Sequence, residues 1–165
     1  KILKRLRPIA AVNNIEVVYE SFRPVTAEVD ETKFSLALSN LVENAIKYNK
    51  ENGWVHVSLN ADHKFFYIEV ADSGIGIAED EVEHIFERFY RVDKSRSRET
   101  GGTGLGLAIV KHVLFRHQAQ LQIESELGKG STFKIIISKA RLAPPINSKD
   151  LLSGTVPESS PVIGV

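Results

Sequence analysis

Apolar and polar residues follow two periodicities along most of the chain, and together these predict a mixture of strands and helices. Five short segments are β-rich or alternate between apolar and polar positions, as strands do. They cover residues 15–20, 54–59, 65–71, 121–124 and 132–137. Turn residues at 62–64 and 128–130 join the second strand to the third and the fourth to the fifth. The pattern therefore predicts an α/β fold that contains β-hairpins.

The longest helical pattern follows Asp30, a residue that can cap a helix N-terminus. Apolar residues then recur at i, i+4, i+7 and i+11, which places them on one buried helical stripe. These residues are Phe34, Leu38, Leu41 and Ala45. The chain should therefore bury this face of the helix against the predicted sheet.

Three further segments have helical character. Residues 105–117 have a core stripe of Leu107, Val110 and Leu114, and residues 79–86 form an acidic, helical turn. Residues 1–13 also have helical spacing, but Pro8 is expected to kink or delimit that helix. A stretch with prolines and serines but no periodicity, residues 142–165, predicts a disordered or vector-derived tail.

Composition narrows the class of protein. At 165 residues, with 42% hydrophobic and 25% charged residues, the chain is typical of one globular domain. Its formal net charge of zero gives no argument for binding nucleic acid or an anionic membrane. The absence of cysteine excludes disulfides and thiol chemistry, and the absence of methionine, even at position 1, predicts a piece of a longer protein. The five histidines lack the spacing of metal ligands, so we assign them structural or surface roles.

Two glycine clusters are the first candidates for chemistry. Gly74 and Gly76 follow Asp72, and Gly102, Gly104 and Gly106 open the helical pattern at 105–117. Glycines before a helix allow backbone N–H groups to approach an anion at its positive end. The segment between the clusters is basic and could fold over phosphates, although it would also fit a solvated surface loop. The clusters predict a phosphate site; neither a P-loop nor a Rossmann motif accompanies them.

The long helix adds a second candidate group. Asn40, Asn44 and Lys47 recur at helical spacing beside the apolar stripe, with Tyr48 next to them. Two asparagines one turn apart place two amide oxygens together, which can accept hydrogen bonds or coordinate a hard cation. A solvated polar face is the structural alternative for these residues. For Asp72 the alternative is a turn aspartate that stabilises its own backbone.

Four of these segments, in this order, resemble the N, G1, F and G2 boxes of sensor histidine kinase catalytic domains. They are residues 40–48, 72–76, 86–91 and 102–107, and the resemblance spans about residues 12–140. It is closest to the PhoR/WalK-like bacterial sensors. The resemblance implies a Bergerat (GHKL) fold: a two-layer α/β sandwich with a mixed, mostly antiparallel sheet of about five strands, about three helices and a flexible ATP lid. It also implies that residues 1–13 end a linker helix from a missing dimerisation domain and that residues 14–141 form the catalytic domain.

The resemblance also implies roles for individual residues. Asp72 would accept the adenine amino group, beside Gly74, Gly76 and Ile77, and Asn44 and Asn40 would hold Mg²⁺ on the ATP phosphates. Lys47 and Tyr48 would line the nucleotide site, and Arg91 in the lid would neutralise charge on the γ-phosphate. The end of the lid and the helix start would face the phosphates; these are Gly102, Thr103, Gly104, Leu105, Gly106 and Leu107.

The reaction implied is transfer of the γ-phosphate of ATP to a histidine, which then passes it to a response regulator. Asn40 stands where hydrolysing relatives have a glutamate base, and Glu43 is a candidate for activating the acceptor. No His-Glu/Asp-x-x-x-Pro acceptor motif is present, so the acceptor should lie on a separate dimerisation domain of a homodimeric, membrane-bound parent, with this piece monomeric and cytoplasmic. A GHKL-type ATPase and a non-catalytic nucleotide-binding or docking module remain the alternatives.

Overall fold

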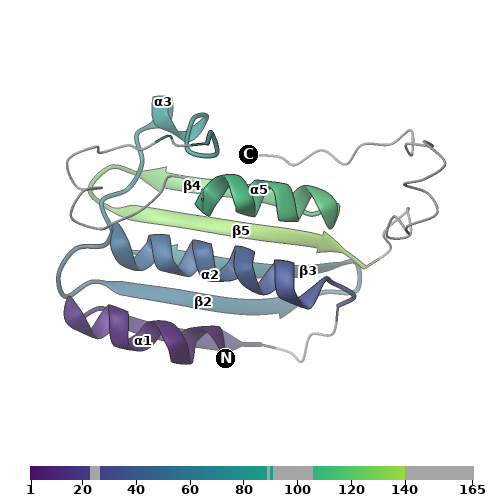
Figure 1. The fold of residues 1–165 in the computed structure, drawn as a ribbon, viewed down its shortest axis with the longest axis horizontal. Helices are drawn as coiled ribbons and strands as arrows, with labels where there is room; N and C mark the ends of the chain where they lie inside the picture. The colour runs from purple at the N-terminus through teal and green to yellow at the C-terminus, as the bar shows by residue number, and fades with distance from the viewer. Residues whose placement is uncertain (23–26, 89, 91–105, 140–165) are drawn as a thin grey trace.

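The computed structural model describes residues 1–22, 27–88, 90 and 106–139, and it has a helical layer packed on an open sheet (Figure 1). The strands are β1 (Glu16–Ser21), β2 (Trp54–Ala61), β3 (Phe65–Asp72), β4 (Gln120–Glu126) and β5 (Gly130–Ser138). The helices are α1 (Ile2–Val12), α2 (Glu31–Lys47), α3 (Glu79–Val82) and α5 (Gly106–Arg116).

The sheet has five strands in the order β1-β2-β3-β5-β4. β1 pairs with β2 in parallel, and the other three neighbouring pairs are antiparallel. The predicted mixed, mostly antiparallel sheet is therefore confirmed. The register places the end of β3 beside the start of β5, with Asp72 opposite Ser131. This pairing positions one end of the candidate site.

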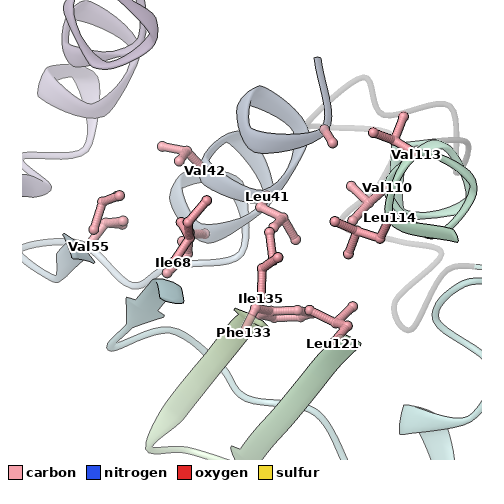
Figure 2. Close-up of a cluster of buried hydrophobic side chains, with 14 of the residues drawn as sticks. Leu41, Val42, Val55, Ile68, Val110, Val113, Leu114, Leu121, Phe133 and Ile135 are labelled. Atoms are coloured by element: carbon pink, nitrogen blue, oxygen red, sulfur yellow. The ribbon is translucent and has the colours of Figure 1, made fainter. Parts of the chain in front are cut away.

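One face of the sheet is buried beneath the helices, because side chains of a strand alternate between its two faces. Alternate residues of β5 are buried, and Phe133 and Ile135 lie in the centre of the core. Figure 2 shows them facing Leu41 of α2 and Leu114 of α5. The helices α1, α2 and α5 lie side by side over this face (Figure 1). The core thus fixes α2 and α5 side by side on one face of the sheet.

The helix α2 forms as its sequence predicts. The carboxylate of Asp30 accepts a hydrogen bond from the backbone N–H of Lys33 at 3.0 Å, so the predicted N-cap is confirmed. Phe34, Leu41 and Ala45 are buried, and Leu38 packs against the core. The apolar stripe therefore faces the sheet, and the asparagines lie beside it.

Two helices differ from the prediction. α1 continues through Pro8 to Val12, so Pro8 does not end the helix. Leu6 and Ala10 of α1 are fully buried in the core, and this packing compensates for the hydrogen bond that a proline cannot donate. α3 ends at Val82, so the predicted helix at 79–86 is one turn followed by further turns. In the described part of the chain, no helix is both long and apolar enough to span a bilayer.

Candidate functional site

The first part of the site lies between α2 and the start of α5. A Cβ atom added to Gly106 would lie 3.6 Å from the side-chain Oδ1 of Asn40, so the two residues are neighbours. The amide nitrogen of Asn40 is buried and has no hydrogen-bond partner among the described residues. Buried amide groups without partners cost free energy, and they are therefore uncommon unless a ligand satisfies them. This amide and the N-terminal end of α5 together suit an anion such as a phosphate.

Asn44 and Lys47 lie further along α2, at the spacing that places them near the face of Asn40. Both side chains are partly buried. Neither makes a side-chain hydrogen bond or ion pair that the structure records with another described residue, so their polar groups are available to a ligand. Amide oxygens are ligands that a hard cation accepts, so the two asparagines fit Mg²⁺ by their chemistry.

The second part of the site is Asp72, the last residue of β3. Its carboxylate accepts a hydrogen bond from the backbone N–H of Gly74 at 2.8 Å and another from the backbone of Ser131. Burial raises the pKa of Asp72 from its ordinary value of 3.8 to about 6, although these two hydrogen bonds lower it. No described Lys, Arg or His forms an ion pair with this carboxylate. Asp72 is thus a half-buried acceptor without a cationic partner among the described residues.

The loop after Asp72 is built against the backbone of other elements. The backbone N–H of Ile75 donates to the carbonyl of Tyr48 at 3.0 Å, and the N–H of Gly128 donates to the carbonyl of Ile75 at 2.8 Å. The N–H of Ile77 donates to the hydroxyl of Ser125 at 2.8 Å. These bonds attach the loop to the end of α2 on one side and to the β4–β5 turn on the other.

Both glycines of this loop are required by the protein's own packing. A Cβ atom at Gly74 would collide with the carbonyl oxygen of Tyr48, and one at Gly76 would collide with the carbonyl oxygen of Glu126. Gly76 also has a φ of +71°, which disfavours any residue with a side chain. The sequence pattern suggested that the glycines admit a ligand, and the structure adds this separate requirement.

Glu43 faces a different neighbour. Its carboxylate lies 3.6 Å from Nη2 of Arg5 on α1, and the same Arg5 nitrogen donates to the hydroxyl of Ser39 at 2.6 Å. Glu43 is therefore oriented toward α1 in this structure. The side chains of Leu107 and Ile77 are partly buried, and both pack against the core.

The remaining predicted site residues lie outside the described residues. They are Arg91, Gly102, Thr103, Gly104 and Leu105, together with the rest of the predicted lid. Two hollows of about 310 and 510 Å³ lie next to β1, and none of the predicted site residues that the structure describes lines either of them.

Three residues near Asp72 were missed by the sequence reasoning. Ser131 supplies a backbone donor to Asp72, and Asn49 and Ser73 form a buried polar contact behind the loop. Asn49 directly follows the segment 40–48, and Ser73 lies within the segment 72–76, but neither was predicted to have a role at the site. The sequence offers one signal for them, since each is a small polar residue in a glycine-rich or turn segment. It does not show which residue each one contacts, because those contacts depend on the register of the sheet.

The fold and the site together are typical of a domain of the Bergerat type. The sheet is open and mixed with one helical layer, an acidic residue ends a strand before two glycines, and two asparagines lie one turn apart on a helix. Residues 29–141 match the family of histidine kinase-, DNA gyrase B-, and HSP90-like ATPases, and the chain belongs to this family.

Its curated relatives are sensor kinases. The chain is 44% identical over 135 residues to the phosphate regulon sensor protein PhoR of Pseudomonas aeruginosa, covering 82% of this chain and 30% of the relative. It is 46% identical over 112 residues to the sensor histidine kinase WalK of Bacillus subtilis, covering 67% of this chain and 18% of that protein. The chain thus spans less than a third of the length of these relatives.

Solved structures agree with the fold. The mycobacterial sensor histidine kinase MprB superposes with a TM-score of 0.71 and 29% identity, over 83% of this chain and 89% of that chain. Full-length ShkA in complex with AMPPNP superposes with a TM-score of 0.72 and 31% identity, over 88% of this chain and 30% of that chain. The predicted Bergerat fold and the resemblance to histidine kinases are both confirmed.

Proposed function

We propose that this chain is the ATP-binding catalytic domain of a two-component sensor histidine kinase. It binds Mg-ATP and presents the γ-phosphate to a histidine on a separate dimerisation helix. The observation that carries the proposal is Asp72: a half-buried carboxylate, free of cationic partners among the described residues, beside a loop whose backbone is fixed. Such an acceptor suits the exocyclic amino group of adenine, which donates two hydrogen bonds. The likeness to a structure solved with AMPPNP, an ATP analogue, supports the same choice of ligand.

The phosphates lie along α2 in this proposal. Asn44, with Asn40 one turn before it, would hold Mg²⁺, which supplies positive charge to the phosphate oxygens. The amide nitrogen of Asn40 donates to a phosphate oxygen, and this bond satisfies a group that is otherwise unpaired among the described residues. Lys47 and Arg91 add positive charge, and Tyr48 lines the site. The backbone amides of 102–107 would face the phosphates.

Phosphoryl transfer is favoured over hydrolysis by the residue types on α2. Asn40 is an amide and cannot remove a proton from water, so it cannot act as a general base. Glu43 is the nearest carboxylate along the helix and is the candidate for accepting the proton of an incoming histidine. Its contact with Arg5 indicates that this role requires the side chain to leave its present position.

The partners follow from the same proposal. The acceptor histidine belongs to the dimerisation domain of the parent protein, a homodimer, and a response regulator receives the phosphoryl group. The relatives support this role in signalling, since PhoR is a sensor protein and WalK is a sensor histidine kinase. The domain functions in the cytoplasm, and the parent is a membrane-bound sensor.

ATP binding by the purified chain tests the proposal. A fluorescent ATP analogue should bind to the parent chain with Mg²⁺ present and be displaced by ATP. Asp72→Ala and Asn44→Asp should each weaken binding at least about tenfold, or about 1.4 kcal/mol. The first removes the acceptor for adenine, and the second places a negative charge beside the phosphates. Asn60→Ala, which removes an exposed asparagine of β2, is the control and should bind like the parent. Equal affinity in all four proteins would refute the site.

Steady-state release of inorganic phosphate separates the kinase from the ATPase alternative. A kinase domain without its acceptor should release phosphate no faster than the Asn44→Asp variant. Sustained release by the parent chain alone would instead favour a GHKL-type ATPase. Binding without transfer when the acceptor helix is supplied would favour a non-catalytic docking module.

A further inference from the structure

We infer that Asn49 and Ser73 are positioning residues, which hold the carboxylate of Asp72 where it can accept the amino group of adenine. The inference rests on the proposed function and deepens it, because it concerns how the same site selects its base. The two residues, called here the Asn49–Ser73 pair, come from different elements: Asn49 follows the C-terminal end of α2, and Ser73 follows β3. Neither side chain makes a hydrogen bond to the carboxylate of Asp72 in the structure.

The pair sits at the centre of a closed set of hydrogen bonds. The hydroxyl of Ser73 donates to Oδ1 of Asn49 at 3.1 Å and accepts from the backbone N–H of Trp54 at 2.8 Å. Nδ2 of Asn49 donates to the carbonyl of Trp54 at 2.9 Å, and Oδ1 also accepts from the N–H of Lys50 at 2.9 Å. The contacts therefore join the end of α2, the start of β2 and the loop after β3.

Burial makes this arrangement rigid. Asn49 is 7% exposed and Ser73 is 4% exposed. A buried polar group that loses its partner costs the full desolvation penalty, so the set has little freedom to rearrange one bond at a time. Gly53 packs directly on the pair, because a Cβ atom there would lie 2.7 Å from the hydroxyl of Ser73 and would also collide with Oδ1 of Asn49.

The pair determines where the carboxylate of Asp72 lies. Ser73 is bonded to Asp72 through the chain, and the next residue, Gly74, donates its N–H to that carboxylate. One residue further, the N–H of Ile75 donates to the carbonyl of Tyr48, next to Asn49. Two of the three residues that follow Asp72, Ser73 and Ile75, are thus attached to the end of α2. Since α2 carries the proposed phosphate ligands, the pair fixes the base acceptor relative to the phosphate site.

Base selectivity distinguishes this role from simple stabilisation. Adenine presents an amino donor to Asp72, whereas guanine presents a carbonyl oxygen, which an ionised carboxylate repels. A carboxylate displaced from its position loses both the attraction and the repulsion, so the ATP preference falls. A loss of stability alone would lower the affinities for ATP and GTP by the same factor.

The experiment measures competitive displacement of a fluorescent ATP analogue by ATP and by GTP, in the parent chain and in three variants. Ser73→Ala removes the hydroxyl, Ser73→Thr retains it, and Ser58→Ala is the control. Ser58 lies on β2, where its hydroxyl contacts Glu69 at 3.5 Å, away from Asp72. Circular dichroism and thermal unfolding establish that each variant is folded.

The ATP-to-GTP preference should fall about tenfold in Ser73→Ala, return in Ser73→Thr and stay at the parent value in Ser58→Ala. Equal losses for both nucleotides in Ser73→Ala, or no loss at all, would overturn the inference while leaving the proposed function intact. Failure of the parent chain to bind either nucleotide would overturn the proposed function and the inference with it.

Amide hydrogen exchange on the parent chain covers the case in which Ser73→Ala does not fold. The N–H groups of Trp54 and Ile75 should exchange slowly before nucleotide is added, since the pair holds the loop in advance. Exchange of these amides at the rate of an unprotected peptide in the nucleotide-free chain would overturn the inference.

Discussion

The raised pKa of Asp72 predicts a specific dependence of stability on pH. The carboxyl titrates near 3.8 in an unfolded chain and near about 6 in the folded protein. Between these values the folded state holds a proton that the unfolded state has released. The free energy of unfolding that Asp72 contributes is therefore fully present below about pH 4, and it is lost as pH rises through about 6.

The magnitude follows from the difference between the two pKa values. A difference of about two pH units corresponds to about 3 kcal/mol. Water reaches the half-buried carboxylate and screens part of this effect, so the expected contribution is about 1–3 kcal/mol. The Asp72→Asn substitution removes the titration while keeping a side-chain oxygen that can accept from the N–H of Gly74.

Urea unfolding from about pH 4 to about pH 7.5 provides the assay. Trp54, the single tryptophan, is a fluorescent probe of the sheet. The stability of the parent relative to Asp72→Asn should fall by about 1–3 kcal/mol across this range, and other titrating groups cancel in the difference. Parallel stability curves for the two proteins would show that Asp72 is not perturbed and would refute the reasoning.

Three further outcomes are expected. The affinity of the parent for ATP should fall nearly tenfold per pH unit below about pH 6, because only the ionised Asp72 accepts from the amino group of adenine. An affinity that does not change with pH would contradict this. Gly76→Ala should lower the free energy of unfolding by about 2 kcal/mol or more, because its Cβ would collide with the backbone of Glu126. Gly128 is also at positive φ but has open space around it, so Gly128→Ala should cost only about 1 kcal/mol. Equal urea midpoints for the two variants would refute the packing argument. His117→Ala should cost about 2–3 kcal/mol, because the His117 ring bonds the N–H of Asp30 at 2.9 Å and the carbonyl of Val113 at 2.8 Å. His112→Ala, an exposed position on α5, is the control, and equal losses in the two variants would contradict this.

The elements that sequence predicted well are those with a local cause. The apolar stripe of α2 and its cap at Asp30 depend on residues within a few turns of one helix, and both are confirmed. The β1–β2 and β3–β5 pairings were less accessible, since a strand's own periodicity does not identify its neighbour.

Long-range contacts explain what sequence reasoning missed at the site. Gly74 and Gly76 were read as room for a ligand, yet their Cβ positions are occupied by backbone atoms of Tyr48 and Glu126. His117 was assigned a structural role, but its partner Asp30 lies 87 residues away. Ser131 reaches Asp72 only because β3 and β5 pair in one register. None of these partners follows from periodicity or composition.

Pro8 illustrates how packing can override a local preference. Proline disfavours a helix interior by about 3 kcal/mol, which is why the sequence predicted a kink or an end. Leu6 and Ala10 on either side of it are each 1% exposed, and their burial holds α1 on α2. The contact between Arg5 and Ser39 adds a polar connection between the two helices.

Transfer of the γ-phosphate tests the central proposal most directly. The chain is incubated with Mg²⁺ and ATP labelled at the γ-phosphate, with and without a separately produced dimerisation domain of the parent protein. Label should appear on a histidine of that domain as an acid-labile, base-stable phosphoramidate, only when both proteins are present, and Asp72→Ala should abolish it. Label released as inorganic phosphate by the chain alone, or no transfer when both are present, would contradict the assignment as the catalytic domain of a histidine kinase.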